Sequence, residues 1–304
     1  RLFNNIINGN IEYYNRKATD LLVRRYMDAT LGVGSRVVNN GEMRNRGIEL
    51  SLTGNIIRTK DWSLSATLNY AHNSNKMLKV DHSDSDYAGL FMMSPTNYFI
   101  EGTAYNTLWA YHIDRFENGY PIAVDKDGND LVTFNEDGTV ASITRPADLK
   151  GTDDVVNMGT LTPKYNGSLS LNLRWKNLEL NTLFVYAGGN KLRLTTLDMN
   201  DNMGSETYEG ITQRWSEATN PNGTRMYLDM PTSVRTYASI FNEWNRYGDH
   251  HVKSADYLKL RSINLSYTLP LDLTHRIGLG RTKFTFQVNN LFTLCRAGHN
   301  IDPE

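Results

Sequence analysis

Aromatic side chains gather in the stretches of this sequence that are richest in turn signals. Indole and phenol rings have large flat faces that stack on sugars and pack against peptide side chains, so these residues are suited to contacting an oligomeric ligand. We predict ligand contacts for six of them: Tyr98, Trp109, Tyr111, Trp215, Tyr237 and Trp244. The same stretches contain five further candidates: Tyr87, Phe91, Phe99, Tyr208 and Tyr227. The alternative role for each ring is packing between loops or against a partner protein.

Two other groups of residues have side chains that bind metals. The segment from Asp125 to Asp130 clusters carboxylates around Gly128, as calcium loops do, but its glycine is at the fourth position instead of the sixth. We interpret it as a turn. His250 and His251 could offer two imidazoles, but adjacent residues of a strand point to opposite faces. We therefore place both on a loop surface and predict no metal site.

Catalysis has little support in the sequence. Asp153, Asp154 and Glu117 could form the carboxylate pair of a glycosidase, but acidic residues are expected in polar loops in any case. No glycine-rich phosphate loop, Ser-His-Asp order or zinc-binding spacing is present. The single cysteine, Cys295, excludes an intrachain disulfide and has no neighbours that suggest a nucleophile. We predict a protein that is not an enzyme and needs no cofactor.

The elements that must position these residues are strands with one apolar and one polar face. Between residues 46 and 56 the apolar side chains fall on even positions, and the same alternation resumes from Trp62 to Tyr70. A period of two held over this length predicts β-strands, and the four polar residues at 58–61 predict a tight hairpin turn.

The same pattern returns twice along the chain. It appears at 167–186, around a turn at 176–177, and at 257–292, where 270–282 joins two strands. In the last pair Lys259 and Arg261 share the parity of the apolar row, so this strand either extends beyond the apolar layer or contains a bulge. A further strand is predicted near 6–17, which makes seven.

The connections between the strands are very unequal. Within hairpins they have two, four or about a dozen residues, whereas between hairpins they cover about 18–44, 75–163 and 191–255. The long connections contain repeated turn signals and room for extra strands, for example at 108–116. Short turns on one side and long loops on the other are typical of outer-membrane barrels, where the long loops face the outside.

Strand length and aromatic placement favour a membrane barrel over a soluble β-sandwich, which also alternates apolar and polar residues. The clean strands have about 9–13 residues, and soluble strands centre on about 5–6. Trp62 and Tyr70 close the two ends of one apolar row, and Trp175 and Tyr186 end two others. The row from Trp62 to Tyr70 spans about 26 Å at ~3.3 Å per residue. A strand tilt near 40° leaves about 20 Å of height, close to the ~25 Å apolar band between aromatic girdles.

Composition agrees with this class. The formal net charge of -1 lacks the basic excess that usually accompanies nucleic-acid binding. No apolar run approaches the roughly 18 residues of a membrane helix. Seven strands with an open edge cannot stand in lipid, so we expect further strands outside this sequence to complete the barrel.

Several segments resemble the C-terminal barrel region of SusC/RagA-type TonB-dependent transporters. Residues 45–52 (NRGIELSL) are similar to a family strand, and residues 159–167 (GTLTPKYNG) to the entry of the next one. The pairs RW at 214–215 and NP at 220–221 resemble a family loop. The most specific similarity is at 254–270 (SADYLKLRSINLSYTLP), followed by NNLFT at 289–293 and DPE at 302–304.

This resemblance implies an all-β fold, as part of a transmembrane antiparallel barrel of 22 strands that a plug domain fills. Residues 1–304 would be the C-terminal part of that barrel, because no plug, TonB box or signal peptide is recognisable in them. It also implies a bacterial outer-membrane location, energy from the TonB complex, a SusD-like surface lipoprotein over the mouth, membrane lipid around the wall, and a dimer of transporter-lipoprotein pairs.

We therefore expect TonB-dependent import of an oligomeric nutrient, either a glycan or a peptide. A passive porin or a siderophore receptor is one alternative. A secreted β-rich glycan-binding or adhesin domain is the other, and detergent dependence would separate it from the membrane proteins.

Overall fold

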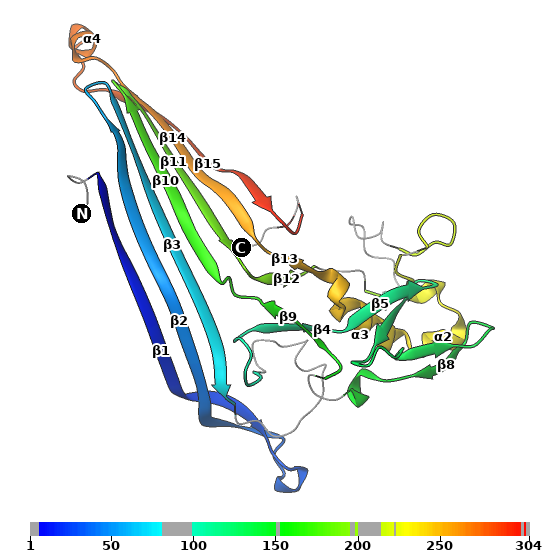
Figure 1. Ribbon diagram of the computed structural model, residues 1–304. Coiled ribbons are helices and arrows are strands. Elements are labelled where there is room, and N and C mark those ends of the chain that lie inside the picture. The colour runs from blue at the N-terminus through cyan, green and yellow to red at the C-terminus, as the bar shows by residue number, and fades with distance from the viewer. Residues whose placement is uncertain are drawn as a thin grey trace.

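The computed structural model describes residues 6–80, 99–149, 153–194, 198–199, 214–221, 223–298 and 301. Its main feature is one antiparallel sheet of seven strands, which forms a long curved wall (Figure 1). The strands follow each other in the order β1 (Ile7–Tyr26), β2 (Ser35–Arg58), β3 (Trp62–Lys79), β10 (Tyr165–Trp175), β11 (Leu178–Gly188), β14 (Tyr257–Thr268) and β15 (Lys283–Cys295). This is the predicted set of seven, and neighbours in sequence are neighbours in the sheet.

The predicted hairpins are confirmed in detail. Trp175 pairs with Leu178 around the two-residue turn, and Arg58 pairs with Ser63 around the turn that follows β2. Strand β3 pairs directly with β10 along its apolar row, from Trp62 opposite Trp175 to His72 opposite Tyr165. Within its described residues, the long connection at 75–163 therefore adds no strand to the wall.

The prediction of a long loop at 18–44 is wrong. Strands β1 and β2 stay paired as far as Tyr26 opposite Ser35, so the connection shrinks to the residues around a short 3-10 helix at Ala29–Leu31. The apolar alternation stops well before this point, so it does not mark the strand end. Backbone hydrogen bonds extend a strand pair without any side-chain pattern, and register shifts near Leu21 let the ladder continue.

A bulge accounts for the irregular pattern of β14. Leu260 pairs with Phe184 and Phe292, and Ser262 pairs with Leu183 and Asn289, so Arg261 is skipped in both ladders. The extra residue shifts the alternation by one position. The row from Ile263 to Tyr267 and the residues before Arg261 therefore follow different parities, as the bulge alternative predicted.

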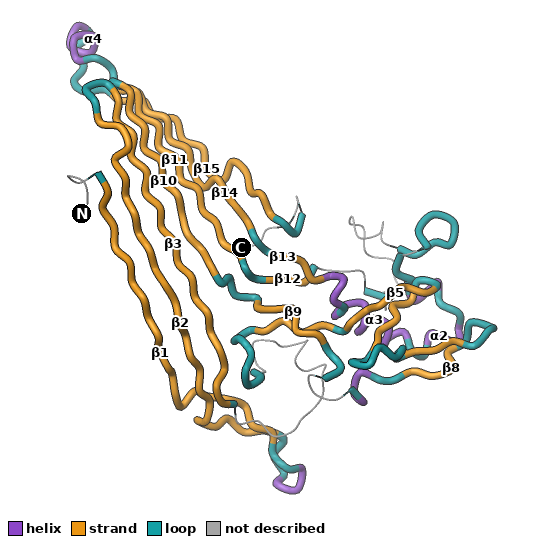
Figure 2. Tube along the Cα trace, viewed as in Figure 1, coloured by secondary structure: helices purple, strands orange, loops and turns teal. Residues whose placement is uncertain are grey.

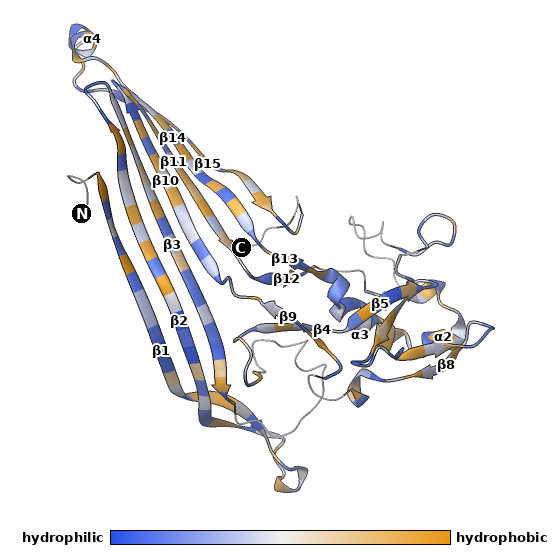
Figure 3. Ribbon diagram, in the orientation of Figure 1, coloured by the Kyte–Doolittle hydropathy of each residue, from blue (hydrophilic) through white to orange (hydrophobic). Residues whose placement is uncertain are grey.

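The wall has one apolar and one polar face, visible as alternating bands along the strands in Figure 3. One row of paired residues crosses five successive strands at the end of the apolar face: Trp62, Trp175, Leu178, Tyr267 and Phe284. The indole rings of Trp62 and Trp175 stack with their centroids 5.6 Å apart. This row is one aromatic girdle, on the side of the short turns. Most of it is exposed, because no other part of the described chain covers it.

Tyrosines form the corresponding row at the other end of the apolar face. Tyr70 and Tyr186 lie on either side of Gly167, and the Tyr186 hydroxyl crosses this glycine to donate a hydrogen bond to the Asn69 carbonyl at 3.1 Å. A Cβ at Gly167 would collide with both groups. The aliphatic rows lie between the two aromatic girdles, as expected for the band that contacts lipid acyl chains.

The short turns and the long loops lie at opposite ends of the wall (Figure 2). The short turns share their end with α4 (Leu271–Arg276), which lies within the connection between β14 and β15. The sequence predicted this connection as a turn and did not indicate the helix. None of the helices in the described ranges is long and apolar enough to cross a membrane.

The described part of the loop end contains eight short strands and two further helices. The strands are β4 (Thr107–Ala110), β5 (His112–Glu117), β6 (Tyr120–Val124), β7 (Val132–Phe134), β8 (Val140–Ile143), β9 (Val156–Thr160), β12 (Lys191–Arg193) and β13 (Val252–Ser254). The helices are α2 (Thr232–Arg235) and α3 (Ala238–Tyr247), with 3-10 turns at Pro146–Asp148, Tyr227–Asp229 and Asp249–His251. The extra strands suggested at 108–116 are present as β4 and β5.

Candidate functional site

The polar face of the wall is a continuous hydrogen-bonded surface. Ser51 donates to Asn69 at 2.8 Å, and Asn69 donates in turn to Ser168 at 3.1 Å, so one chain of side-chain bonds crosses three strands. Thr53 and Thr67 are 3.0 Å apart in the neighbouring row. A hollow of about 230 Å³ lies beside this network. Such a surface is suited to lining a water-filled interior.

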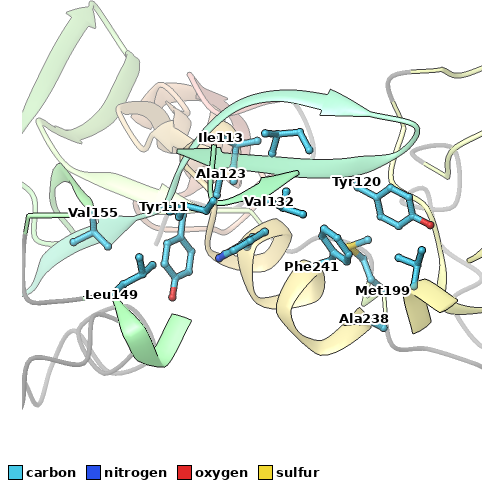
Figure 4. Close-up of a cluster of buried hydrophobic side chains, with 14 of the residues drawn as sticks. Tyr111, Ile113, Tyr120, Ala123, Val132, Leu149, Val155, Met199, Ala238 and Phe241 are labelled. Carbon is cyan, nitrogen blue, oxygen red and sulfur yellow. The ribbon is translucent and has the colours of Figure 1, made fainter. Parts of the chain in front are cut away.

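The two long connections fold together into one unit, which we call the loop subdomain: the described residues of 99–160 and 191–255. Helix α3 from the second connection packs against β5 and β6 from the first (Figure 4). The Tyr111 hydroxyl donates to Glu243 at 2.8 Å, and its backbone N–H donates to the Tyr247 carbonyl at 3.1 Å. Because these partners are more than a hundred residues apart in sequence, neither connection forms this unit alone.

A buried cluster holds the loop subdomain together. The first connection contributes Trp109, Tyr111, Ile113, Tyr120, Ile122, Ala123, Leu131, Val132, Leu149 and Val155, and the second contributes Met199, Met230, Val234, Ala238, Phe241 and Trp244. Its aromatic centre is Phe241, whose ring centroid lies 4.8 Å from that of Tyr120 and 5.9 Å from that of Trp244. Burial of this many large side chains makes the unit a small hydrophobic core outside the wall.

Burial removes three of the six predicted contact residues from consideration. Trp109 is 6% exposed, and Tyr111 and Trp244 are fully buried in the cluster. A ring without accessible surface cannot stack on a ligand, so the prediction of direct contact is wrong for these three, and packing between the loops is what they do. Their apolar area stabilises the subdomain instead.

The other predicted contact residues have different outcomes. Trp215 and Tyr237 are half-buried and keep part of their rings accessible. Tyr98 lies outside the described residues, as do Tyr87, Phe91 and Tyr208. Phe99 and Tyr227 are also half-buried, and Phe99 stacks on Tyr105 with centroids 5.1 Å apart.

Trp215 belongs to a cluster of aromatic and charged groups. The guanidinium of Arg225 lies 3.6 Å from the centre of the Trp215 ring and donates through Nη1 to the Asp229 carbonyl at 3.0 Å. Arg214 forms a two-pronged ion pair with the Asp229 carboxylate, at 2.6 and 2.9 Å. This hydrogen-bonded pair lowers the pKa of Asp229 below its usual value. We call Arg214, Trp215 and Arg225, together with Asp229, the aromatic patch.

The sequence signals did not identify Arg225 as part of a site. It lies ten residues after Trp215, between the NP turn and α2, and no local motif marks it. Its backbone N–H also donates to the Gly119 carbonyl at 2.9 Å, and its Nε donates to the Asn118 carbonyl at 2.8 Å. Arg225 therefore ties the second connection to the β5–β6 turn and fixes the position of Trp215.

His250 and His251 are half-buried, which differs from the predicted position on a loop surface. Their ring centroids are 3.9 Å apart, and the His250 ring also meets Phe116 edge-on at 5.2 Å. Burial lowers the pKa of His250 to about 4 and that of His251 to about 3. Both imidazoles are therefore neutral near pH 7. The 3-10 turn at Asp249–His251 brings these adjacent rings together, which a strand would not do.

The Asp125 segment forms the predicted turn. Asp125 accepts hydrogen bonds from the backbone N–H groups of Asp127 and Asn129, at 2.9 and 2.8 Å, which uses its oxygens to close the loop. The hydrogen bond from the Asn129 side chain, together with these backbone bonds, lowers the pKa of Asp125. Over the described ranges, no group of three or more potential ligand residues is arranged to hold a metal ion.

Comparison with known proteins places the chain in a family. The sequence model of the family described as "TonB dependent receptor-like, beta-barrel" matches residues 1–291. "TonB-dependent receptor P3" of Formosa agariphila is 26% identical over 313 aligned residues, which cover 100% of this chain and 29% of that protein. "TonB-dependent receptor SusC" of Bacteroides thetaiotaomicron is 31% identical over 141 residues, or 42% of this chain and 14% of that protein.

Solved structures agree at the level of the fold. The RagAB peptide importer in its "closed-closed" state superposes with a TM-score of 0.70 at 22% identity, covering 99% of this chain and 31% of that chain. A second structure, of the RagAB peptide transporter, gives 0.69 at 23% identity. The chain thus spans less than a third of the length of these relatives.

The family consists of transporters and not enzymes, which agrees with the prediction from the sequence. The outer-membrane location of this family also explains why the apolar face of the wall is exposed. The same location excludes the two soluble alternatives, a β-sandwich and a secreted adhesin domain. The chain belongs to the TonB dependent receptor-like β-barrel family, and it forms part of the strand wall and loops of a SusC/RagA-like barrel in the bacterial outer membrane.

Proposed function

We propose that this chain forms part of the wall and the loop end of a transporter that imports an oligomeric nutrient, a peptide or a glycan, across the outer membrane. The observation that carries the proposal is the loop subdomain, a folded unit at the loop end of a polar wall. It holds the aromatic patch where an arriving solute would meet it before the barrel interior. TonB supplies the energy in this proposal, through a part of the protein outside these residues.

The chemistry of the aromatic patch supports ligands with both flat apolar faces and polar groups. One face of the Trp215 ring is covered by the Arg225 guanidinium, so a ligand stacks on the rest of the ring or displaces the arginine. Arg214 is paired with Asp229, and Arg225 already donates through Nε and Nη1 to two backbone carbonyls. A peptide carboxylate or carbonyl would therefore bind Arg225 through its remaining guanidinium N–H groups. Sugar rings and peptide side chains can both use such a surface.

The fold similarity to the RagAB peptide importer supports including peptides among the substrates, and the sequence similarity to SusC supports a role in nutrient uptake. We further propose that a SusD-like surface lipoprotein covers the loop subdomain and that two transporter-lipoprotein pairs associate. A lid protein needs a rigid surface to close on, and the buried cluster of the subdomain provides one.

Growth and uptake of a deletion strain test the proposal. The full-length protein should restore growth on one defined class of polymer, with labelled oligomers of that class accumulating only when TonB is intact. Arg225→Ala and Trp215→Ala should reduce uptake without reducing the amount of protein in the outer membrane. Lys126→Ala, at an exposed turn of the same subdomain, is the matched control. TonB-independent uptake would contradict the proposal and favour a passive porin.

A further inference from the structure

The short-turn end of the wall has an apolar helix with no described partner. In α4 and the turn after it, Leu271, Leu273, Ile277 and Leu279 are between 49% and 62% exposed. Leu273 and Ile277, the C-cap residue that follows α4, are four residues apart and lie on the same side of this segment. Thr274, between them, is fully buried, and its hydroxyl donates to the Leu271 carbonyl within the helix at 3.1 Å. This much exposed aliphatic surface on a short turn is unfavourable in water.

This apolar surface lies next to the turn-side aromatic girdle of the wall. Helix α4 begins three residues after Thr268, the last residue of β14, and lies in the hairpin connection that follows the paired girdle residues Tyr267 and Phe284. Figure 1 shows α4 at the tip of the wall, past the ends of the strands. Because aromatic girdles lie at the level of lipid headgroups, a helix just beyond them reaches the interface between bilayer and water.

Basic residues dominate the same end of the wall. The short turns and α4 contain Arg58, Lys60, Lys176, Arg276 and Arg281, against only Asp61 and Asp272. All seven are exposed, and none of these bases forms an ion pair with another described residue. Backbone bonds tie the turns into one surface: Lys176 donates to the Asp61 carbonyl at 2.7 Å, and Thr268 donates to the Asn177 carbonyl at 3.0 Å.

We propose that α4 is an interfacial helix that inserts Leu273 and Ile277 into the membrane leaflet on the turn side, while Arg276, Arg281 and the neighbouring lysines bind anionic phospholipid headgroups. Apolar surface and basic charge beside one another are the features that hold amphipathic segments at a bilayer surface. On the helix, Asp272 and Arg276 are four residues apart and share the polar side, which faces water and headgroups. The inference depends on the family and the fold, and it stands whether or not the transport proposal is correct.

Environment-sensitive probes in the full-length protein test the insertion. Native cysteines are replaced, Cys295→Ser included, and single cysteines are introduced as Leu273→Cys and Ile277→Cys for labelling with a fluorophore that shifts to the blue in apolar surroundings. In vesicles of phosphatidylcholine and phosphatidylglycerol, both probes should shift, and lipids with brominated acyl chains should quench about half of their emission or more. Asp272→Cys, on the polar side of the same helix, and Asp137→Cys, in the loop subdomain, are the controls.

The headgroup contact has its own readout. The affinity of the protein for phosphatidylglycerol over phosphatidylcholine is measured from bound lipid, and Arg276→Gln and Arg281→Gln should each lower it by about fivefold at low salt. Lys126→Gln in the loop subdomain should leave it unchanged. Water-like emission at both Leu273 and Ile277, or equal quenching at Asp272, overturns the insertion. An unchanged lipid preference in the arginine variants overturns the headgroup contact.

Discussion

An arginine placed on the membrane face of β10 should cost far more stability than the same residue one position away. Leu171 lies in the middle of the apolar band, four residues from Trp175 in the turn-side girdle and four from Gly167 between the loop-side tyrosines. Ser170 precedes it and points to the polar face, where it lies opposite Thr67 and Leu183. The two positions share a strand, a depth and a backbone environment, so only the face differs.

The expected cost follows from the depth in the bilayer. Arginine facing lipid at the midplane destabilises a barrel by about 2–4 kcal/mol, and near the interface the cost falls to about 0–1 kcal/mol. Leu171→Arg should therefore lower the free energy of unfolding by about 2–4 kcal/mol. Leu178→Arg, in the turn-side girdle row, should cost about 1 kcal/mol or less. Ser170→Arg should stay within about 0.5 kcal/mol of the parent, because its side chain enters a wet interior.

The assay is unfolding of the full-length protein in lipid vesicles with increasing urea, followed by tryptophan fluorescence. The slope of the transition must be equal among the variants for the comparison to report stability alone. Equal losses for Leu171→Arg and Ser170→Arg would refute the assignment of the two faces. A loss at Leu178 as large as that at Leu171 would refute the placement of the girdle at the interface.

Three further predictions concern the loop subdomain. Phe241→Ala should remove the aromatic centre of the buried cluster and destabilise the subdomain by about 3–5 kcal/mol. Hydrogen exchange should then accelerate at 107–160 and 238–247 but not in the strands of the wall. Uniform acceleration would contradict a separate folding unit. Lowering the pH should destabilise the same unit, because the folded state lowers the pKa values of His250 and His251 and so favours the neutral imidazoles. This contribution to stability is complete above a pH of about 6.5, the ordinary histidine pKa. It declines as the pH falls toward about 4. His250→Phe should flatten that decline in hydrogen exchange between pH 6.5 and 4.5, and an unchanged slope would show that other groups cause it. Gly119→Ala should disturb the aromatic patch, since the Gly119 φ of +81° is unfavourable for alanine and a Cβ would lie 2.6 Å from the Trp215 ring. We expect reduced uptake with normal protein levels in the outer membrane. Normal uptake would mean that the position of Trp215 is not important.

Local patterns in the sequence were sufficient to predict the wall. Alternation with a period of two determined the strands, their membrane face and the turn at 176–177, because each of these depends on residues close together in the chain. The aromatic ends of the apolar rows were also visible, and the register then places Trp62 against Trp175. The ends of β1 and β2 were not predictable in this way, since backbone pairing continues where the side-chain pattern has stopped.

The loop subdomain was decided by tertiary structure alone. Tyr111 and Glu243 are 132 residues apart, and nothing in the neighbourhood of either shows that they meet. For this reason Trp109, Tyr111 and Trp244 had the appearance of exposed ligand contacts in the sequence, and the fold buries them. An aromatic residue in a polar loop has the same local signal whether it binds a ligand or forms a core. Only the packing of one long connection against the other distinguishes the two, which leaves the aromatic patch as the surface to test.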